Sequence, residues 1–380
     1  METRQLYYEN SLLQSFAATV LSCEKEDGGY SVVLDATVFY PGGGGQACDT
    51  GMLDDVRVRK VYEQGAQIIH LCDGPLTSGK TVTGTIDWNA RFSRMQQHTG
   101  EHIVSGLIHK HFGCHNVGFH MGAELVTVDF DGMLTTEQLL QVEQEANALI
   151  WQDVPVRCWY PQEAELPRIP YRSKRQLPWP VRIVQIPGGD TCACCGTHVA
   201  NTGQIGLVKI FSCVKFHQGV RVEMACGALA LDLLGKAYEQ NRLVSQVFSA
   251  KILATGEAAQ KMNEALAAEK YRATGLEKRL FAAIARQYAG AGDTLHFESD
   301  LLPASVRLLA EQIAQVCGGT AAVFSGSDGK YDVCLADVAK DIKALGMAMN
   351  QALCGRGGGK GGFFQGSVSA TQAQIKGFFS

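Results

Sequence analysis

The spacing of apolar and polar positions changes at about residue 90. From Leu6 to Trp88 the chain alternates apolar and polar residues in short runs, such as Ser31–Asp35 and Gln67–Leu71, which Gly, Pro and Asp interrupt. Alternation with a period of two is typical of strands with one buried face. We therefore expect residues 1–90 to form a small β-barrel-like domain. Its middle contains the loop Phe39–Gln46, whose four glycines permit positive φ angles and close backbone contact with a partner, or form a plain surface turn.

Helical spacing begins at Ser93, a suitable N-cap, and apolar residues recur every three or four positions until Gly113. This pattern predicts a helix of about twenty residues. A second amphipathic helix is predicted over Thr136–Trp151. Strands are predicted at Leu125–Phe130, Arg182–Ile186 and Gly206–Lys215. Residues 91–225 thus read as an α+β domain.

Residues 226–290 are rich in Ala, Leu, Glu, Lys and Gln and contain no proline. Good helix formers with one break at Thr255-Gly256 predict two long helices. Apolar residues of the second helix recur at multiples of about 3.5, from Met262 through Leu266 to Leu280. The segment is either a helical linker that forms a coiled-coil-like arm or a pair of ordinary packed helices.

A βαββα alternation follows in residues 291–380, and a glycine-rich stretch comes after it. The predicted elements are Thr294–Phe297, Ala304–Cys317, Ala321–Ser325, Tyr331–Ala336 and Val338–Cys354. This segment is expected to be a separate small α/β domain. The fold class expected for the whole chain is α+β multidomain.

Composition narrows the class of protein. Hydrophobic residues make up 46% of the 380, which is enough for buried cores, and 34 basic against 38 acidic side chains leave a net charge of -4. A nucleic-acid partner would therefore need local basic patches. No apolar run reaches the roughly 18 residues of a membrane helix, and the first residues form no secretory signal. We expect a cytoplasmic protein without a membrane partner, in which the thirteen cysteines are reduced thiols or metal ligands.

Two pairs of residues carry the strongest chemical signal. His98 and His102 are four residues apart on the predicted helix, so their imidazoles lie on one face and can bind one ion. Cys194 and His198 repeat that spacing in a glycine-containing loop. One thiolate and three imidazoles form a donor set that Zn²⁺ prefers, in tetrahedral geometry. The sequence predicts a zinc site at these four residues.

The neighbouring residues leave several questions open. Cys192 and Cys195 are alternative thiolate ligands. Four protein ligands are the pattern of a structural zinc site, whereas a catalytic site usually keeps one position open, and the sequence does not decide between them. Thr99, Glu101 and Asp190 are candidates for positioning a water molecule or orienting an imidazole.

Two basic segments are candidates for binding nucleic acid. Five cations and no acid occur within fifteen residues, beside two aromatic side chains: Arg168, Arg172, Lys174, Arg175 and Arg182, with Tyr171 and Trp179. Such a segment suits phosphates and stacked bases of a single strand, or is a solvated loop. Near the end of the chain, Arg356 and Lys360 are surrounded by glycines, which let phosphates approach main-chain N–H groups.

These residues resemble a known family. Gln97–Ser105 and Thr191–Val199 are similar to the zinc site of the editing domain of alanyl-tRNA synthetase and of its free-standing relatives, the AlaX proteins. The usual second motif is Cys-Gly-Gly-Thr-His-Val, in which Cys195 here replaces a glycine. Phe39–Gln46 resembles the glycine-rich segment of the medium and long forms, and Gly355–Ser367 resembles the end of the synthetase's DHH-associated domain. The chain resembles long-form AlaX.

The resemblance implies an activity and a set of roles. It implies a zinc-dependent, ATP-independent hydrolase that acts in trans on tRNA(Ala) mischarged with serine or glycine. The remaining implied site residues are His120 beside the ester, and Thr99, Gly44, Gly45 and Gln46 in contact with the substrate. Residues 291–380 are implied to bind tRNA and to mediate a homodimer. The alternatives are a non-catalytic tRNA- or RNA-binding protein with a structural zinc site and, third, a zinc hydrolase of unrelated small esters.

Overall fold

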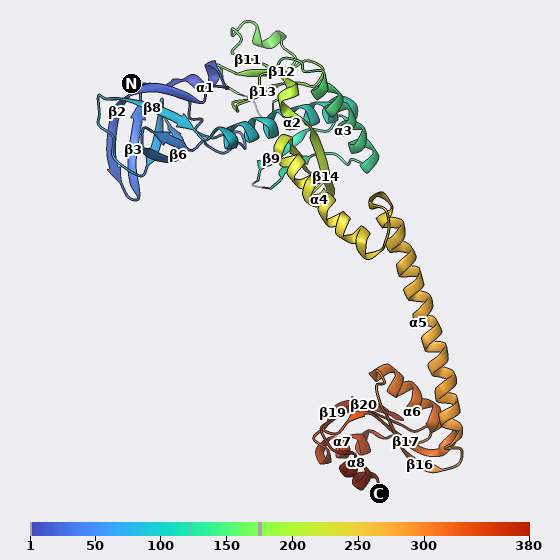
Figure 1. Cartoon of the computed structure of the whole chain (residues 1–380). Helices are drawn as coiled ribbons and strands as arrows, with labels where there is room; N and C mark the ends of the chain where they lie inside the picture. The colour runs from blue at the N-terminus through green and yellow to red at the C-terminus, as the bar shows by residue number, and fades with distance from the viewer. Residues whose placement is uncertain (1, 123, 174–176) are drawn as a thin grey trace. The chain divides into compact units, whose positions relative to one another are not determined.

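The computed structural model describes residues 2–122, 124–173 and 177–380. The chain divides into two compact units, Met1–Arg242 and Leu243–Ser380, and both combine helices with sheets (Figure 1). The mixed α/β, multidomain class agrees with the sequence. The four domain boundaries drawn from the sequence are finer than this division and stay predictions.

The first unit begins with a closed barrel in which the strand order is β2-β3-β7-β6-β5-β8. The strands are β2 (Ser15–Glu26), β3 (Gly29–Leu34), β5 (Gly51–Leu53), β6 (Val56–Gln64), β7 (Gln67–Cys72) and β8 (Thr81–Ile86). Every second residue of β8 is buried, as the alternating pattern requires. Val32, Leu34 and Ile68 are among the side chains that fill the interior. The short elements β1 (Arg4–Gln5), α1 (Leu6–Glu9) and β4 (Ala36–Thr37) precede the glycine-rich loop.

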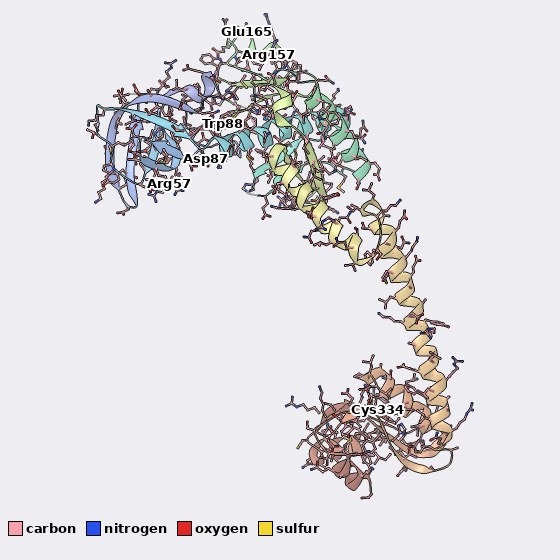
Figure 2. All side chains as sticks on the ribbon, viewed as in Figure 1. Arg57, Asp87, Trp88, Arg157, Glu165 and Cys334 are labelled. Atoms are coloured by element: carbon pink, nitrogen blue, oxygen red, sulfur yellow. The ribbon has the colours of Figure 1, made fainter. Side chains whose placement is uncertain are left out.

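Helix α2 (Trp88–Phe112) leads from the barrel into the rest of this unit (Figure 1). Its N-cap is Asp87, whose side chain accepts a hydrogen bond from the N–H of Ala90; Asp87 and Trp88 are labelled in Figure 2. The predicted start at Ser93 was therefore wrong. The helix ends at Gly113, which adopts the left-handed conformation with φ 70°. Nearly every side chain from Met95 to Ile108 is buried, so the helix is a core element on most of its circumference.

Around α2 lie two sheets and a second helix. The four-stranded sheet has the order β14-β15-β10-β9 and the three-stranded sheet has the order β11-β12-β13. Their strands are β9 (Asn116–Met121), β10 (Val126–Phe130), β11 (Arg157–Trp159), β12 (Ile183–Ile186), β13 (Asp190–Ala193), β14 (Val208–Phe216) and β15 (Gly219–Cys226). Helix α3 (Thr136–Trp151) has the predicted bounds and packs on α2. Short 3-10 turns occupy η1 (Leu166–Arg168) and η2 (Thr202–Ile205).

Helices α4 (Gly227–Val247) and α5 (Thr255–Arg286) confirm the two predicted helices, with η3 (Ile252–Ala254) at the break. In the second unit, Phe281 and Ala285 of α5 are buried in one core with α6 (Pro303–Cys317). Met262, Leu266 and Leu280 are all more than half exposed, so the predicted apolar stripe lies mainly on the surface of α5.

The second unit is built on a five-stranded sheet with the order β16-β17-β18-β20-β19. Its elements are β16 (Gly292–Glu298), β17 (Gly318–Ser327), β18 (Lys330–Ala336), α7 (Lys343–Ala352), β19 (Arg356–Gly359), β20 (Phe363–Val368) and α8 (Gln372–Phe379). Only β16 and β17 are paired in parallel among these strands. Cys334, labelled in Figure 2, is buried in β18. None of the described helices is long and apolar enough to cross a membrane.

Candidate metal centre

Four side chains converge where α2 faces the segment after β13. His98 and His102 extend from consecutive turns of α2, and Cys194 and His198 follow β13. One donor atom from each lies within 4.8 Å of all the others, and the Sγ of Cys194 is 3.4 Å from the Nε2 of His98. Zinc bonds of about 2.0–2.3 Å place tetrahedral donors roughly 3.3–3.8 Å apart. The four donors can therefore hold one ion after small side-chain shifts.

Gln46 fixes the orientation of the first imidazole. Its Oε1 lies 3.0 Å from the Nδ1 of His98, and because a carbonyl oxygen can only accept, Nδ1 carries the proton. Nε2 then keeps the lone pair that a metal requires. The Gln46 amide group also donates to the hydroxyl of Thr197 at 2.7 Å and accepts from the Thr197 N–H at 3.1 Å. A buried glutamine of the glycine-rich loop therefore connects α2 to the loop after β13.

Thr99 does the same for His198. The Thr99 hydroxyl donates to the carbonyl of Met95 at 2.7 Å, so its oxygen accepts from the Nδ1–H of His198 at 3.2 Å and from the N–H of Val199 at 3.3 Å. Burial, reinforced by His102 and His98, lowers the pKa of His198 well below its usual range. The neutral ring thus has its lone pair on Nε2, which is buried and has no hydrogen-bond partner within the described part of the chain. A metal ion is the partner that fits this atom.

The third imidazole, that of His102, is supported by two residues of β13. Nδ1 of His102 lies 3.2 Å from the Sγ of Cys192 and 3.5 Å from Oδ2 of Asp190. Asp190 is in turn held by two hydrogen bonds of 2.8 Å from Arg172. This is the carboxylate–histidine arrangement that orients metal-binding histidines. His102, Asp190 and Cys192 also have donor atoms within 4.8 Å of one another, so Cys192 stays an alternative thiolate.

The thiol of Cys194 needs a cation to ionise. Burial raises the pKa of Cys194 to about 12, so without a metal the thiol is neutral at physiological pH. A bound divalent cation lowers that pKa because it stabilises the thiolate directly. One sulfur and three imidazole nitrogens match the preferences of zinc. Cys195 is exposed, and its Sγ lies 4.0 Å from the Tyr40 hydroxyl, on the side of the glycine-rich loop.

Hydrogen bonds hold the loop of Cys194 in place. One nitrogen of the Arg182 guanidinium donates to the carbonyls of Cys194 and Gly196, both at 2.9 Å, and the Tyr8 hydroxyl donates to the carbonyl of Cys195 at 2.8 Å. Gly196 packs so closely that an added Cβ would overlap the ring of His98. The loop position therefore depends on the absence of a side chain at residue 196.

A cavity of about 900 Å³ opens beside the four donors. Its wall includes Phe119, which stacks on His98 with ring centroids 5.3 Å apart. Other lining residues are His98, His102, Cys194, Gly44, Glu101, Asn116, Tyr160, Tyr171 and Arg172. This volume lies within the usual range of small-molecule sites, and it exceeds what a single amino acid occupies.

The sequence is similar to proteins that act on or charge tRNA, by their names. Residues 181–222, which include Cys194 and His198, match the family model described as threonyl and alanyl tRNA synthetase second additional domain, and residues 4–90 match tRNA synthetases class II (A). The alanyl-tRNA editing protein Aarsd1 of Mus musculus is 27% identical over 391 residues, which cover 96% of this chain and 94% of that protein. Aarsd1-A of Xenopus laevis is 29% identical and covers 90% and 85%. This chain is a relative of the alanyl-tRNA editing proteins.

Alanine–tRNA ligases are similar as well. That of Thermofilum pendens is 31% identical over 396 residues, and the match covers 98% of this chain but 43% of the ligase. This relative of the editing proteins thus spans less than half the length of that ligase. The C-Ala domain of Aquifex aeolicus alanyl-tRNA synthetase matches 23% of this chain at 21% identity and a TM-score of 0.20, which does not establish a shared fold.

In this relative of the editing proteins, the other predicted site residues lie in different surroundings. Gly44 lines the cavity, and Gly45 packs against Phe119. Gln46 is buried against His98 and Thr197, where the sequence predicted a substrate contact. His120 is exposed on β9 and is not among the lining residues, whereas its neighbour Phe119 is.

Glu101 lines the cavity but is already anchored. One oxygen of its buried carboxylate accepts hydrogen bonds from the Ser105 hydroxyl and the Asn116 amide. Sequence reasoning missed this role of Asn116, because no periodicity connects residue 116 to α2.

The basic residues predicted to bind tRNA differ in exposure and in ion pairing. Arg168 is exposed in η1, while Arg172 is paired with Asp190. Lys174 and Arg175 lie outside the described residues. Arg356 and Lys360 are exposed in the second unit, at either end of the run that contains β19.

Proposed function

We propose that this protein is a zinc-dependent hydrolase that removes serine or glycine from mischarged tRNA(Ala) by cleaving the aminoacyl ester at the tRNA 3′ end. The observation that carries the proposal is the convergence of His98, His102, Cys194 and His198 beside a cavity that the first three line, in a relative of the alanyl-tRNA editing proteins. A bound Zn²⁺ supplies Lewis-acid polarisation of an ester carbonyl and lowers the pKa of water.

The protein's own residues supply positioning. Gln46, Thr99 and Asp190 each support the Nδ1 side of a different histidine, so the three Nε2 atoms are preset as donors. Phe119 forms an apolar wall over His98. The cavity has room for a small aminoacyl group together with part of the terminal nucleoside.

The physical need for such an enzyme lies in the limits of binding selectivity. A pocket for alanine cannot exclude the smaller glycine by size and rejects serine only weakly, because serine adds one hydroxyl. Discrimination of about 100-fold falls short of what translation requires, so a second, hydrolytic site is needed.

For tRNA, we propose that Arg356 and Lys360 contact phosphates. Both side chains are exposed, and Gly357 and Gly358 between them are exposed as well. They lie on β19, an edge strand that pairs with β20 on one side only, so its other edge is left for main-chain contacts.

One observation favours a second function. Four protein donors fill a tetrahedral shell, which is the pattern of structural zinc. In that case the protein binds tRNA without hydrolysis.

The test is incubation of the purified protein with Ser-tRNA(Ala), Gly-tRNA(Ala) and Ala-tRNA(Ala), with and without a chelator, together with zinc analysis. We expect one zinc per chain and hydrolysis of the serine or glycine ester far faster than of the alanine ester. His102→Ala and Cys194→Ala should lose zinc and activity. His111→Ala, on the same helix but outside the cavity, and Cys354→Ala, an exposed thiol of the second unit, should retain both.

Each of three other results would contradict one part of the proposal. Full zinc content in both ligand variants would refute the metal site. Equal hydrolysis of Ala-tRNA(Ala) would refute the specificity. Hydrolysis of no ester would leave the tRNA-binding function.

A further inference from the structure

Asn116 is the first residue of β9, and the fold pairs only one end of its side-chain amide. It lines the cavity and is 7% exposed. Its Nδ2 donates to the carboxylate of Glu101 and to the Ser105 hydroxyl. Because a carboxylate only accepts, this contact fixes which end of the amide faces Glu101.

The other end of the amide is open. The Oδ1 of Asn116 is buried and accepts no hydrogen bond from any residue that the structure describes. Buried acceptors are almost always paired, and an unpaired one is destabilising. An apolar residue at position 116 would avoid that cost. An amide with an unpaired acceptor on a cavity wall therefore indicates a hydrogen-bond donor that arrives with a ligand.

The surroundings indicate the charge of that donor. Behind the amide is the buried carboxylate of Glu101, whose negative charge favours a cation near this part of the wall. Two arginines also line the cavity. Arg172 is neutralised by Asp190, and Arg182 is held by the carbonyls of Cys194 and Gly196, away from Glu101 in its hydrogen bonding. A cationic donor is favoured at Oδ1 because its hydrogen bond is charge-assisted and is strengthened in a site that excludes water.

We propose that the Oδ1 of Asn116 binds the α-ammonium group of the aminoacyl ester, an inference that rests on the deacylase function proposed above. Glu101 directly precedes His102 on α2, and both line the cavity, so anchor and metal centre face the same space. Anchoring the ammonium group orients the ester and directs the amino-acid side chain to the remaining wall. Asn116 is thus a general amino-acid anchor, and serine, glycine and alanine all carry the group that it recognises.

The test compares two esters of tRNA(Ala). One carries serine, and the other carries the 3-hydroxypropanoyl group, which is serine with hydrogen in place of the ammonium. Asn116→Leu removes the acceptor at similar volume. We expect its kcat/KM to fall roughly 10- to 100-fold on the seryl ester and to stay within about twofold of the wild type on the deamino ester. Val117→Ala, at the exposed next position of β9, should change neither rate.

A direct binding measurement on the wild type keeps the test independent of how the variant folds. Binding of 3′-seryl-amino adenosine, in which an amide replaces the ester, is compared with binding of its deamino counterpart, and we expect at least a tenfold preference for the ammonium. Equal loss of Asn116→Leu on both esters, or no preference between the analogues, would overturn the anchor. If the wild type hydrolyses neither ester, the deacylase proposal fails, and analogue binding alone decides the ammonium contact.

Discussion

Replacing Gln46 tests whether the glycine-rich loop controls the metal centre. In Gln46→Leu the Nδ1–H of His98 loses its acceptor, so the ring is no longer held in the tautomer that presents Nε2. Loss of such a supporting contact typically lowers metal affinity by about 10- to 100-fold, or roughly 1.4–2.7 kcal/mol. Gln46 is 3% exposed, so water does not readily replace it.

The same substitution also affects stability. The N–H and hydroxyl of Thr197 lose their partners along with His98. A buried polar group left unpaired costs about 1–3 kcal/mol. We therefore expect a lower free energy of unfolding in the metal-free protein, separate from the loss of zinc affinity.

The assay is competition for zinc against a chromophoric chelator at pH 7, combined with urea unfolding of the metal-free protein. Gln96→Leu is the matched control. Gln96 is a buried glutamine of α2 that donates to the backbone carbonyl of Gln204 and has no hydrogen bond to the four donors. It should lose stability and keep its zinc affinity. Zinc affinity of Gln46→Leu within about twofold of the wild type, or an equal loss in Gln96→Leu, would refute the reasoning.

Three further outcomes are expected. Gly196→Ala should lower zinc affinity at least about tenfold, because the added methyl group displaces the ring of His98. Competition with a chelator measures the affinity, and an unchanged value would contradict the packing argument. Burial lowers the pKa of His70 to about 4, whereas the unfolded chain accepts this proton below about pH 6.5. The free energy of unfolding should therefore fall by about 3 kcal/mol as the pH drops from 6.5 to 4. Urea unfolding measures this, and His70→Leu should lack that part of the loss. Neutralising Arg356 and Lys360 together should raise the KM for tRNA and leave the zinc content unchanged. The slope of log tRNA affinity against log salt concentration should become shallower by about 1.5. An unchanged KM would show that the two residues do not hold tRNA.

Local signals explain which helices could be predicted. Helix α3 has the expected bounds, and at its start Thr135 and Gln138 form a capping box that is readable within four residues. The start of α2 was predicted too late, at Ser93, because Ser93 is itself a suitable N-cap. In the structure Arg91 is fully buried and paired with Asp49 of the glycine-rich loop, a partner that sequence spacing does not reveal.

The strands β19 and β20 were not predicted for a related reason. Gly357, Gly358 and Gly359 have no side chains, so no alternation of apolar and polar positions marks β19. Its conformation comes from pairing with β20, which in turn pairs with β18. Tertiary pairing decides such segments, and local propensity does not.

The four candidate donors were readable because His98 with His102 and Cys194 with His198 share one spacing and offer metal-binding atoms. The fold then brings the two pairs within 4.8 Å of each other. Their supporting residues were not readable. Gln46 contacts His98 across 52 positions of sequence, whereas the resemblance implied a substrate contact for it. Asn116 has no motif around it, and only the hydrogen bonds to Glu101 and Ser105 single it out.

The distance along the chain between the two ligand pairs has a consequence for biosynthesis. About 100 residues separate His98 from His198, and at roughly 5–20 residues per second a ribosome needs about 5–20 s to make them. During that interval the nascent chain has two imidazoles and no Cys194, so it can hold a metal ion only weakly. Loading of the proposed metal centre would therefore wait until the loop after β13 has emerged and docked against α2. All four candidate donors and Gln46 are synthesised before the second unit begins at Leu243, so the proposed centre would be complete while the last 138 residues are still being made.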